Sequence, residues 1–123
     1  MRIELLEDHQ GLSRMLQLSL RLAGHTVHTS QTIIDFLTFM DSSAPIDLII
    51  VDFRLLAERS EIGLSGADVI RHVRTTSPDL PAILISAVPL TKLEAAIVGL
   101  SRVRVLQKPF KTANLVEMIG EFT

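Results

Sequence analysis

The chain has 123 residues, of which 47% are hydrophobic and 21% charged, and its formal net charge is -2 at pH 7. This length and composition are typical of one domain, here residues 1–123, with a single core, and the small net charge gives no sign of a nucleic-acid-binding surface. The absence of Cys excludes disulfides and thiolate metal sites, and no segment fits a signal peptide or a membrane span, so we expect a soluble, cytoplasmic protein.

Segments with strand and helix patterns alternate five times along the chain. Short apolar runs rich in β-branched residues indicate strands, and apolar residues at helical spacing indicate helices. In chain order we expect a strand at 3–6, a helix at 12–23, a strand at 26–29, a helix at 33–40, a strand at 48–51, a helix at 66–77, a strand at 81–85, a helix at 91–100, a strand at 103–106 and a helix at 113–122.

Polar residues mark the expected starts of three helices. Ser30 can cap the second helix, and Thr112 can cap the last one. Ser65 and Asp68 have the spacing of a capping box at the start of the third helix. The buried face of the second helix is expected to carry Ile33, Ile34, Leu37 and Met40.

The central strand is expected at residues 48–51, because this apolar run is continuous and such runs are typical of strands buried on both faces of a parallel sheet. Each crossover between parallel strands should be right-handed, which places helices on both faces of the sheet. The carboxyl ends of all five strands then open on one edge, where ligands bind in open α/β sheets. Asp52 directly follows the central strand and lies at this edge.

Four strands bring polar side chains to the same edge. The first ends in Glu7 and Asp8, the third in Asp52, the fourth in Ser86, and the fifth is followed by Lys108. Three carboxylates in one cleft repel one another unless a cation lies among them. Because all the candidate ligands are hard oxygens, Mg²⁺ or Mn²⁺ is the expected ion, with Asp8 and Asp52 as direct ligands and Glu7 acting through water.

The same set of side chains suits phosphoryl transfer. A carboxylate such as that of Asp52 can attack phosphorus and form an acyl phosphate. Catalysis of this step is mainly positioning and charge neutralisation. The metal ion, the ammonium of Lys108 and the hydroxyl of Ser86 would each neutralise or bind one side of the phosphoryl group.

The chain resembles the receiver domains of response regulators in two-component signalling. The matching segments occur in the family's order, each at the end of an expected strand, and cover essentially the whole chain. They are Leu5-Leu6-Glu7-Asp8, Leu48-Ile49-Ile50-Val51-Asp52, Ile85-Ser86-Ala87 and Lys108-Pro109-Phe110. The resemblance implies a flavodoxin-like (βα)5 fold with a five-stranded parallel sheet in the order 2-1-3-4-5.

The resemblance also implies which residues hold the phosphoryl group and the metal. Asp52 would accept a phosphoryl group from a phosphohistidine of a sensor histidine kinase or a phosphotransfer protein. Mg²⁺ would be held by Asp8, Asp52 and the backbone carbonyl of Arg54, with Glu7 assisting.

The phosphoryl oxygens would be bound by the segment after the fourth strand and by the lysine after the fifth. The residues that match the family at these places are Ser86, Ala87 and Lys108. The bond between Lys108 and Pro109 would be cis, as is typical of the family. The domain would catalyse only its own phosphorylation and dephosphorylation, so it is expected to be a switch and not a turnover enzyme.

Two places depart from the family's pattern. Receivers commonly carry an aromatic residue three positions before the lysine, where this chain has Val105. The usual coupling, in which an aromatic ring moves inward behind the hydroxyl, cannot operate in that form. The second departure is a long polar loop after Asp52, which contains Glu58-Arg59-Ser60-Glu61 and reaches the best match for the family's glycine only at Gly66.

The expected partners are the phosphodonor kinase or phosphotransfer protein and an output domain or downstream protein. A homodimer surface on the fourth helix, fifth strand and fifth helix is a further expectation, and neither a membrane nor direct nucleic-acid contact is expected. Two alternatives remain open at this point. One is a phosphate-independent, receiver-like interaction module, and the other is a flavodoxin-like small-molecule enzyme or cofactor binder.

Overall fold

A computed structural model describes residues 1–42, 45–54 and 64–122 and shows the expected alternation of strands and helices. In chain order the elements are β1 (Arg2–Leu6), α1 (Gln10–Leu22), β2 (Thr26–Ser30), α2 (Ile33–Ser42), β3 (Leu48–Asp52), α3 (Gly66–Arg74), β4 (Ala82–Ser86), α4 (Leu90–Ala96), β5 (Val103–Gln107) and α5 (Thr112–Gly120). Among these described residues, no helix is both long and apolar enough to cross a membrane.

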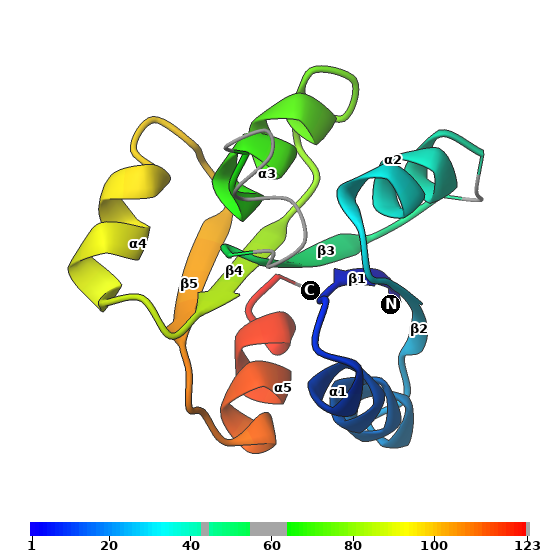
Figure 1. Cartoon of the computed structure of the whole chain (residues 1–123). Coiled ribbons are helices and arrows are strands. Elements are labelled where there is room, and N and C mark those ends of the chain that lie inside the picture. The colour runs from blue at the N-terminus through cyan, green and yellow to red at the C-terminus, as the bar shows by residue number, and fades with distance from the viewer. Residues whose placement is uncertain (43–44, 55–63, 123) are drawn as a thin grey trace.

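The five strands form one parallel sheet in the order β2-β1-β3-β4-β5, which confirms the predicted topology. Helices cover both faces of this sheet, with α1 and α5 on one side and α2, α3 and α4 on the other (Figure 1). The reversal of strand order between β1 and β3 places a topological switch point beside the end of the central strand.

The continuous apolar run of β3 is explained by burial on both faces. Ile49 and Val51 pack into the core beneath α2, α3 and α4, whereas Leu48 and Ile50 pack into the core beneath α1 and α5. All four side chains are fully buried. Asp52 is the last residue of the strand, and it lies where the sheet leaves both cores.

Predicted details of α2 were wrong in two respects. Ser30 does not cap the helix, because it is the last residue of β2 and its hydroxyl donates to Glu4. Thr32 takes that role, since its Oγ1 accepts a hydrogen bond from the backbone N–H of Asp35. Ile34 is 75% exposed, and Phe36 is the fully buried aromatic residue of this helix.

Other helix boundaries were predicted with mixed success. The capping box of Ser65 and Asp68 at the start of α3 is confirmed. Thr112 is the first residue of α5, and Lys111 occupies the cap position without a side-chain hydrogen bond. The fourth helix was predicted too long, because α4 ends at Ala96 and the chain then turns toward Gly99, which has a φ of +87°.

A buried carboxylate lies beneath α2, in a strand that the sequence indicated as apolar. Glu4 is fully buried, and its Oε1 accepts a 2.9 Å hydrogen bond from the hydroxyl of Ser30. Its Oε2 lies 2.8 Å from Nδ1 of His28, whose ring stacks on Phe39 with a centroid distance of 3.7 Å. Burial raises the pKa of Glu4 to about 7, although the hydrogen bond from Ser30 and the charge of His28 act in the opposite direction.

Candidate functional site

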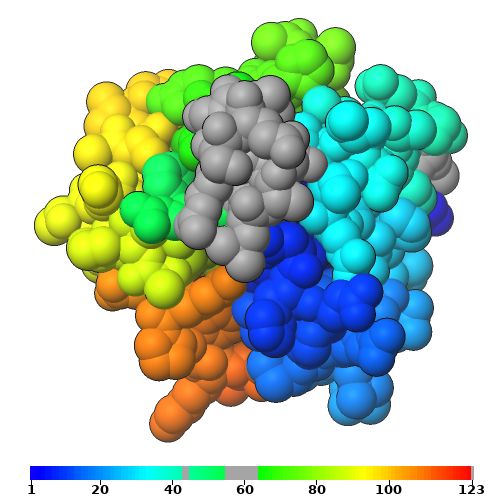
Figure 2. All heavy atoms as spheres, in the orientation of Figure 1, coloured from blue at the N-terminus to red at the C-terminus, as the bar shows by residue number. Residues whose placement is uncertain are grey.

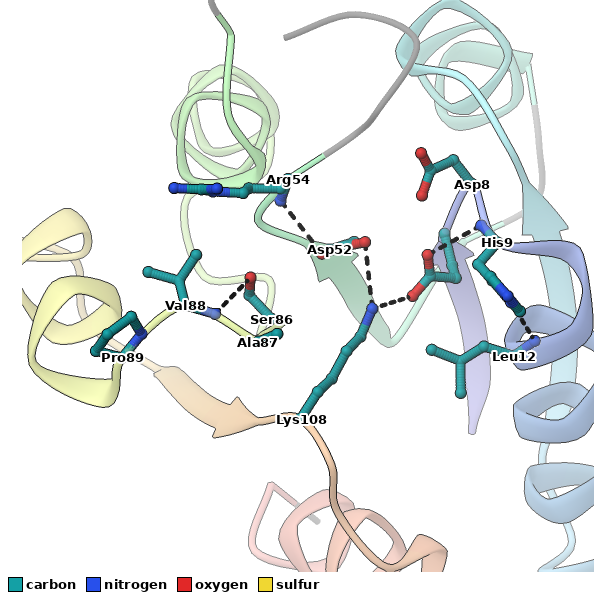
Figure 3. Close-up of a pocket in the computed structure, with 11 residues that line it drawn as sticks. Asp8, His9, Leu12, Asp52, Arg54, Ser86, Ala87, Val88, Pro89 and Lys108 are labelled. Carbon is teal, nitrogen blue, oxygen red and sulfur yellow. Dashed lines mark hydrogen bonds and ion pairs between the residues drawn. The ribbon is translucent and has the colours of Figure 1, made fainter.

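The carboxyl ends of the strands border a cavity of about 630 Å³ (Figure 3). On the molecular surface, the start of α1, the segment after β4 and the segment after β5 meet on one face (Figure 2). The described residues that line the cavity are Glu7, Asp8, His9, Leu12, Asp52, Arg54, Ser86, Ala87, Val88, Pro89 and Lys108. All the residues that were predicted to bind the metal ion or the phosphoryl group line this cavity. Val105, the predicted switch position, does not line it.

Three carboxylates converge in this cavity, as the sequence predicted. Glu7, Asp8 and Asp52 each place one carboxylate oxygen within 4.8 Å of the others. Glu7 and Asp52 are buried, and Asp8 is half-buried. Hard oxygen donors at this spacing fit Mg²⁺ or Mn²⁺, which prefer carboxylate and carbonyl ligands and retain several waters.

The ammonium of Lys108 bridges two of these carboxylates. Its Nζ donates to Oε1 of Glu7 over 2.7 Å and to Oδ2 of Asp52 over 3.3 Å. Burial alone would raise the pKa of Glu7, but the hydrogen bonds from Lys108 and from the backbone N–H of His9 lower it. Burial likewise opposes the charge on Lys108, yet its bond to Glu7 and the charge of Asp52 raise its pKa.

The pKa of Asp52 shifts in the opposite direction from that of Glu7. Burial raises the pKa of Asp52 to about 7, and the neighbouring charge of Glu7 acts in the same direction. The ammonium of Lys108 opposes the shift, as does the backbone N–H of Arg54, which donates to Oδ1 of Asp52 over 3.2 Å. A carboxyl group with this pKa takes up or loses its proton near neutral pH.

The raised pKa of Asp52 predicts that the metal-free protein is destabilised by this residue as the pH rises. A carboxyl group whose folded pKa exceeds its unfolded value of 3.8 lowers the stability above that value, progressively until about pH 7. Asp52→Asn should therefore increase the free energy of unfolding more at pH 8 than at pH 5.5, by about 2 kcal/mol. Urea unfolding in the presence of a chelator measures the difference, and a pH-independent effect would contradict the assignment.

The segment after β4 is held from both sides. The hydroxyl of Ser86 accepts a 3.2 Å hydrogen bond from the backbone N–H of Val88, and the carbonyl of Ser86 accepts a 2.7 Å bond from the backbone N–H of Lys108. Ala87 is exposed at the cavity wall. The peptide bond between Lys108 and Pro109 is cis, which confirms the prediction.

The two departures from the family's pattern have different outcomes in the structure. Val105 is half-buried in β5, opposite Leu84, and packs against the core beneath α3 and α4. The polar residues 58–61 of the loop after Asp52 lie outside the described residues, so the role of this loop stays a prediction. Gly66, which follows the loop, is the first residue of α3.

Sequence reasoning missed the roles of His9, which lines the cavity, and of Gln107, which lies near it. His9 caps α1, because its Nδ1 accepts a 3.0 Å hydrogen bond from the backbone N–H of Leu12. Gln107 donates from Nε2 to the carbonyl of Val88 over 3.1 Å. Histidine is not a usual cap and a glutamine at a strand end has no fixed partner, so neither contact had a signal in the sequence.

A family profile matches nearly the whole chain, and solved structures share its fold. Residues 3–120 match the profile of the response regulator receiver domain. A chemotaxis protein of Vibrio cholerae, CheY4, has 18% identity and a TM-score of 0.86, with 99% of this chain and 98% of that chain covered. The receiver domain of NtrX from Brucella abortus has 23% identity and a TM-score of 0.83, with coverage of 98% and 96%. A comparison with curated proteins found no significant match.

Proposed function

Because this chain belongs to the response regulator receiver domain family, whose members are phosphoryl-accepting signalling domains, we propose that Asp52 is its phosphoacceptor. The observation that carries the proposal is the convergence of Asp52 with Glu7, Asp8 and Lys108 at one edge of the sheet. These residues come from three strand ends and are up to 101 positions apart in the sequence. Such convergence is expected for a site that stabilises a transferred, negatively charged group.

Mg²⁺ is the proposed metal, held by Asp8 and Asp52 with Glu7 assisting and with the backbone carbonyl of Arg54 as a further ligand. The three carboxylates supply the hard oxygen donors that this ion prefers. When bound, the ion would neutralise part of the charge on the phosphoryl oxygens. Lys108 already pairs with Glu7 and Asp52, so metal binding and the ammonium would share these carboxylates.

In the proposed reaction, a carboxylate oxygen of Asp52 forms a bond to phosphorus while the bond from phosphorus to the donor's histidine nitrogen breaks. The imidazole leaves with the electron pair of that bond and is then protonated. Lys108 would pair with one phosphoryl oxygen, and the hydroxyl of Ser86 and the backbone N–H of Ala87 would donate to others. Because Asp52 must be ionised to attack, its pKa of about 7 makes the deprotonated form available at neutral pH.

The acyl phosphate would act as a switch by shifting a conformational equilibrium. It adds about -1.5 to -2 charges at the strand edge, and it favours whichever arrangement it binds more tightly. We propose a sensor histidine kinase or phosphotransfer protein as the donor and an output domain or downstream protein as the receiver of the signal. A homodimer formed by α4, β5 and α5 is one form that this output surface could take.

A phosphate-independent interaction module is the second candidate, and Val105 is the observation that favours it. This half-buried aliphatic residue stands where the family commonly has a movable aromatic ring. In that case the phosphoacceptor site is present while the usual readout of phosphorylation is absent. The two candidates differ in whether an acyl-phosphate mimic changes the protein.

Thermal melting with Mg²⁺ and then with Mg²⁺ plus beryllofluoride, a mimic of the acyl phosphate, tests the proposal. Each addition should raise the melting temperature, because a ligand that binds only the folded state stabilises it by about 2.7 kcal/mol at a hundredfold excess over Kd. Asp52→Asn should abolish the response to beryllofluoride. Asp79→Asn, an exposed carboxylate beside Leu80 and Pro81 at the opposite edge of the sheet, is the control and should respond normally.

The outcomes separate the candidates. A wild type that responds to both ligands, together with an Asp52→Asn variant that no longer responds to beryllofluoride, supports the phosphoacceptor. No response of the wild type to either ligand contradicts it and favours the interaction module.

A further inference from the structure

Val88, the residue before the cap of α4, is held through both of its backbone groups. Its N–H donates to the hydroxyl of Ser86 over 3.2 Å, and its carbonyl accepts from Nε2 of Gln107 over 3.1 Å. Ser86 and Gln107 are register partners in neighbouring strands, β4 and β5. The segment that leads into α4 is therefore fastened to the ends of two strands at once.

The first of these bonds ties the hydroxyl of Ser86 to the backbone at Val88. A serine hydroxyl can accept this N–H and still donate its own hydrogen, but a rotation that carries its oxygen toward a phosphoryl group on Asp52 would release the N–H of Val88. Val88 is only 6% exposed, and a buried N–H must find another acceptor. The segment around Val88 therefore has to shift when Ser86 turns toward the phosphoryl group.

The second bond opposes that shift, because Gln107 holds the carbonyl of the same residue to β5. Pro89 follows with a φ of -52°, and a proline restricts the backbone conformations open to the residue before it, here Val88. The side chain of Val88 packs in the same core as Leu93 of α4, and Val105 packs against that core. We therefore expect movement of Val88 to disturb the core on which α4 packs.

We infer that Gln107 is a positioning residue that holds the β4–α4 segment in its unphosphorylated arrangement through the bond to Val88, and that this bond breaks when Asp52 is phosphorylated. The inference rests on the proposed function of Asp52 and Ser86. It gives the side-chain amide of Gln107 the role of coupling phosphorylation of Asp52 to the position of α4. Val105 is too small to provide this coupling in the way that an aromatic ring does in the family. The bond from Gln107 to Val88 stabilises the unphosphorylated state. Its removal should therefore shift the equilibrium toward the state that binds the phosphoryl group or its mimic.

The test measures beryllofluoride affinity by calorimetry at a saturating Mg²⁺ concentration. Gln107→Met keeps the length and shape of the side chain but removes the donor. It should tighten beryllofluoride binding by roughly 2- to 10-fold, which corresponds to one net hydrogen bond present in only one of the two states. The affinity for Mg²⁺ alone should stay unchanged, because Gln107 does not line the cavity.

Gln17→Met is the matched control. Gln17 makes the same kind of bond at the same length, from Nε2 to the carbonyl of Val27 over 3.1 Å, but between α1 and β2. Its loss should leave the beryllofluoride affinity unchanged. Because the coupling acts through Ser86, the gain from Gln107→Met should also disappear in a Ser86→Ala background.

A second readout follows the bond itself. The side-chain amide resonances of Gln107 should move toward those of a solvent-exposed glutamine when beryllofluoride binds, whereas those of Gln17 should not move. Unchanged or weaker beryllofluoride binding by Gln107→Met, with a normal wild-type response, would overturn the inference and leave the phosphoacceptor standing. No beryllofluoride binding by the wild type would overturn both.

Discussion

Gly66→Ala should lower the free energy of unfolding by about 3 kcal/mol, a large part of the stability of a domain of this size. A Cβ at this position would lie 2.3 Å from the carbonyl oxygen of Asp52 and 2.9 Å from Cγ1 of Val51. The helix cannot step aside easily, because the N–H of Gly66 donates to the carbonyl of Phe53 over 2.9 Å. The atoms in the way are mostly backbone at the end of the central strand, so relief requires moving Asp52 itself.

Urea unfolding measures this loss, and Gly120→Ala is the matched control. A Cβ at Gly120, at the end of α5, would meet nothing within 4 Å. Alanine is favoured over glycine in helices by up to about 1 kcal/mol, so this variant should be equal to the wild type or more stable. If Gly66→Ala had the same free energy of unfolding as the wild type, the start of α3 could not be packed directly against the backbone of Asp52. The variant should also weaken the response to beryllofluoride, whereas Gly120→Ala should not.

Lys108→Ala should abolish the switch and destabilise the metal-free protein. Without the ammonium, Glu7 and Asp52 are left as adjacent buried carboxylates with no counter-charge, and one of them must take up a proton. We expect a loss of about 2 kcal/mol in the presence of a chelator at pH 7.5, which is less than a buried pair usually loses because protonation relieves the repulsion.

The same variant should still bind Mg²⁺, because its proposed carboxylate ligands remain. The change in partner binding or oligomeric state on phosphorylation should be lost, because nothing replaces the cation at the phosphoryl oxygen. Lys111→Ala removes a lysine whose side chain is exposed three positions further along, and it should behave like the wild type. A Lys108→Ala protein that switches normally would show that Lys108 does not have this role.

The fold and the convergence of the site could be predicted because both follow from patterns that the sequence carries openly. The continuous apolar run before Asp52 indicated a central strand, and the parallel topology then placed Lys108 beside Glu7. Contacts that depend on one side chain finding one backbone group could not be predicted. The capping of α1 by His9 and the bond from Gln107 to Val88 belong to this class.

A different limit applies to Glu4. A charged residue inside a strand of five residues is ordinarily assigned to the solvent side, and its partners His28 and Ser30 are more than twenty positions away. The sequence therefore offered no reason to place a carboxylate in the core. Only the pairing of β1 with β2 shows that Glu4 lies opposite His28.

This buried carboxylate has a consequence for how the sheet aligns its outermost strand. The segment Thr26–Ser30 is short, carries only one fully apolar side chain and lies at an edge, so hydrophobic patterning alone would align it weakly. A slip by one residue would place Val27 or Thr29 opposite Glu4 and leave the carboxylate without its imidazole. Because an unpaired buried charge is far more costly than a mismatched apolar contact, the polar cluster fixes the alignment of β2. The pairing of Glu4 with His28 thus specifies the register of the edge strand β2, whereas the continuous apolar run specifies the position of the central strand β3.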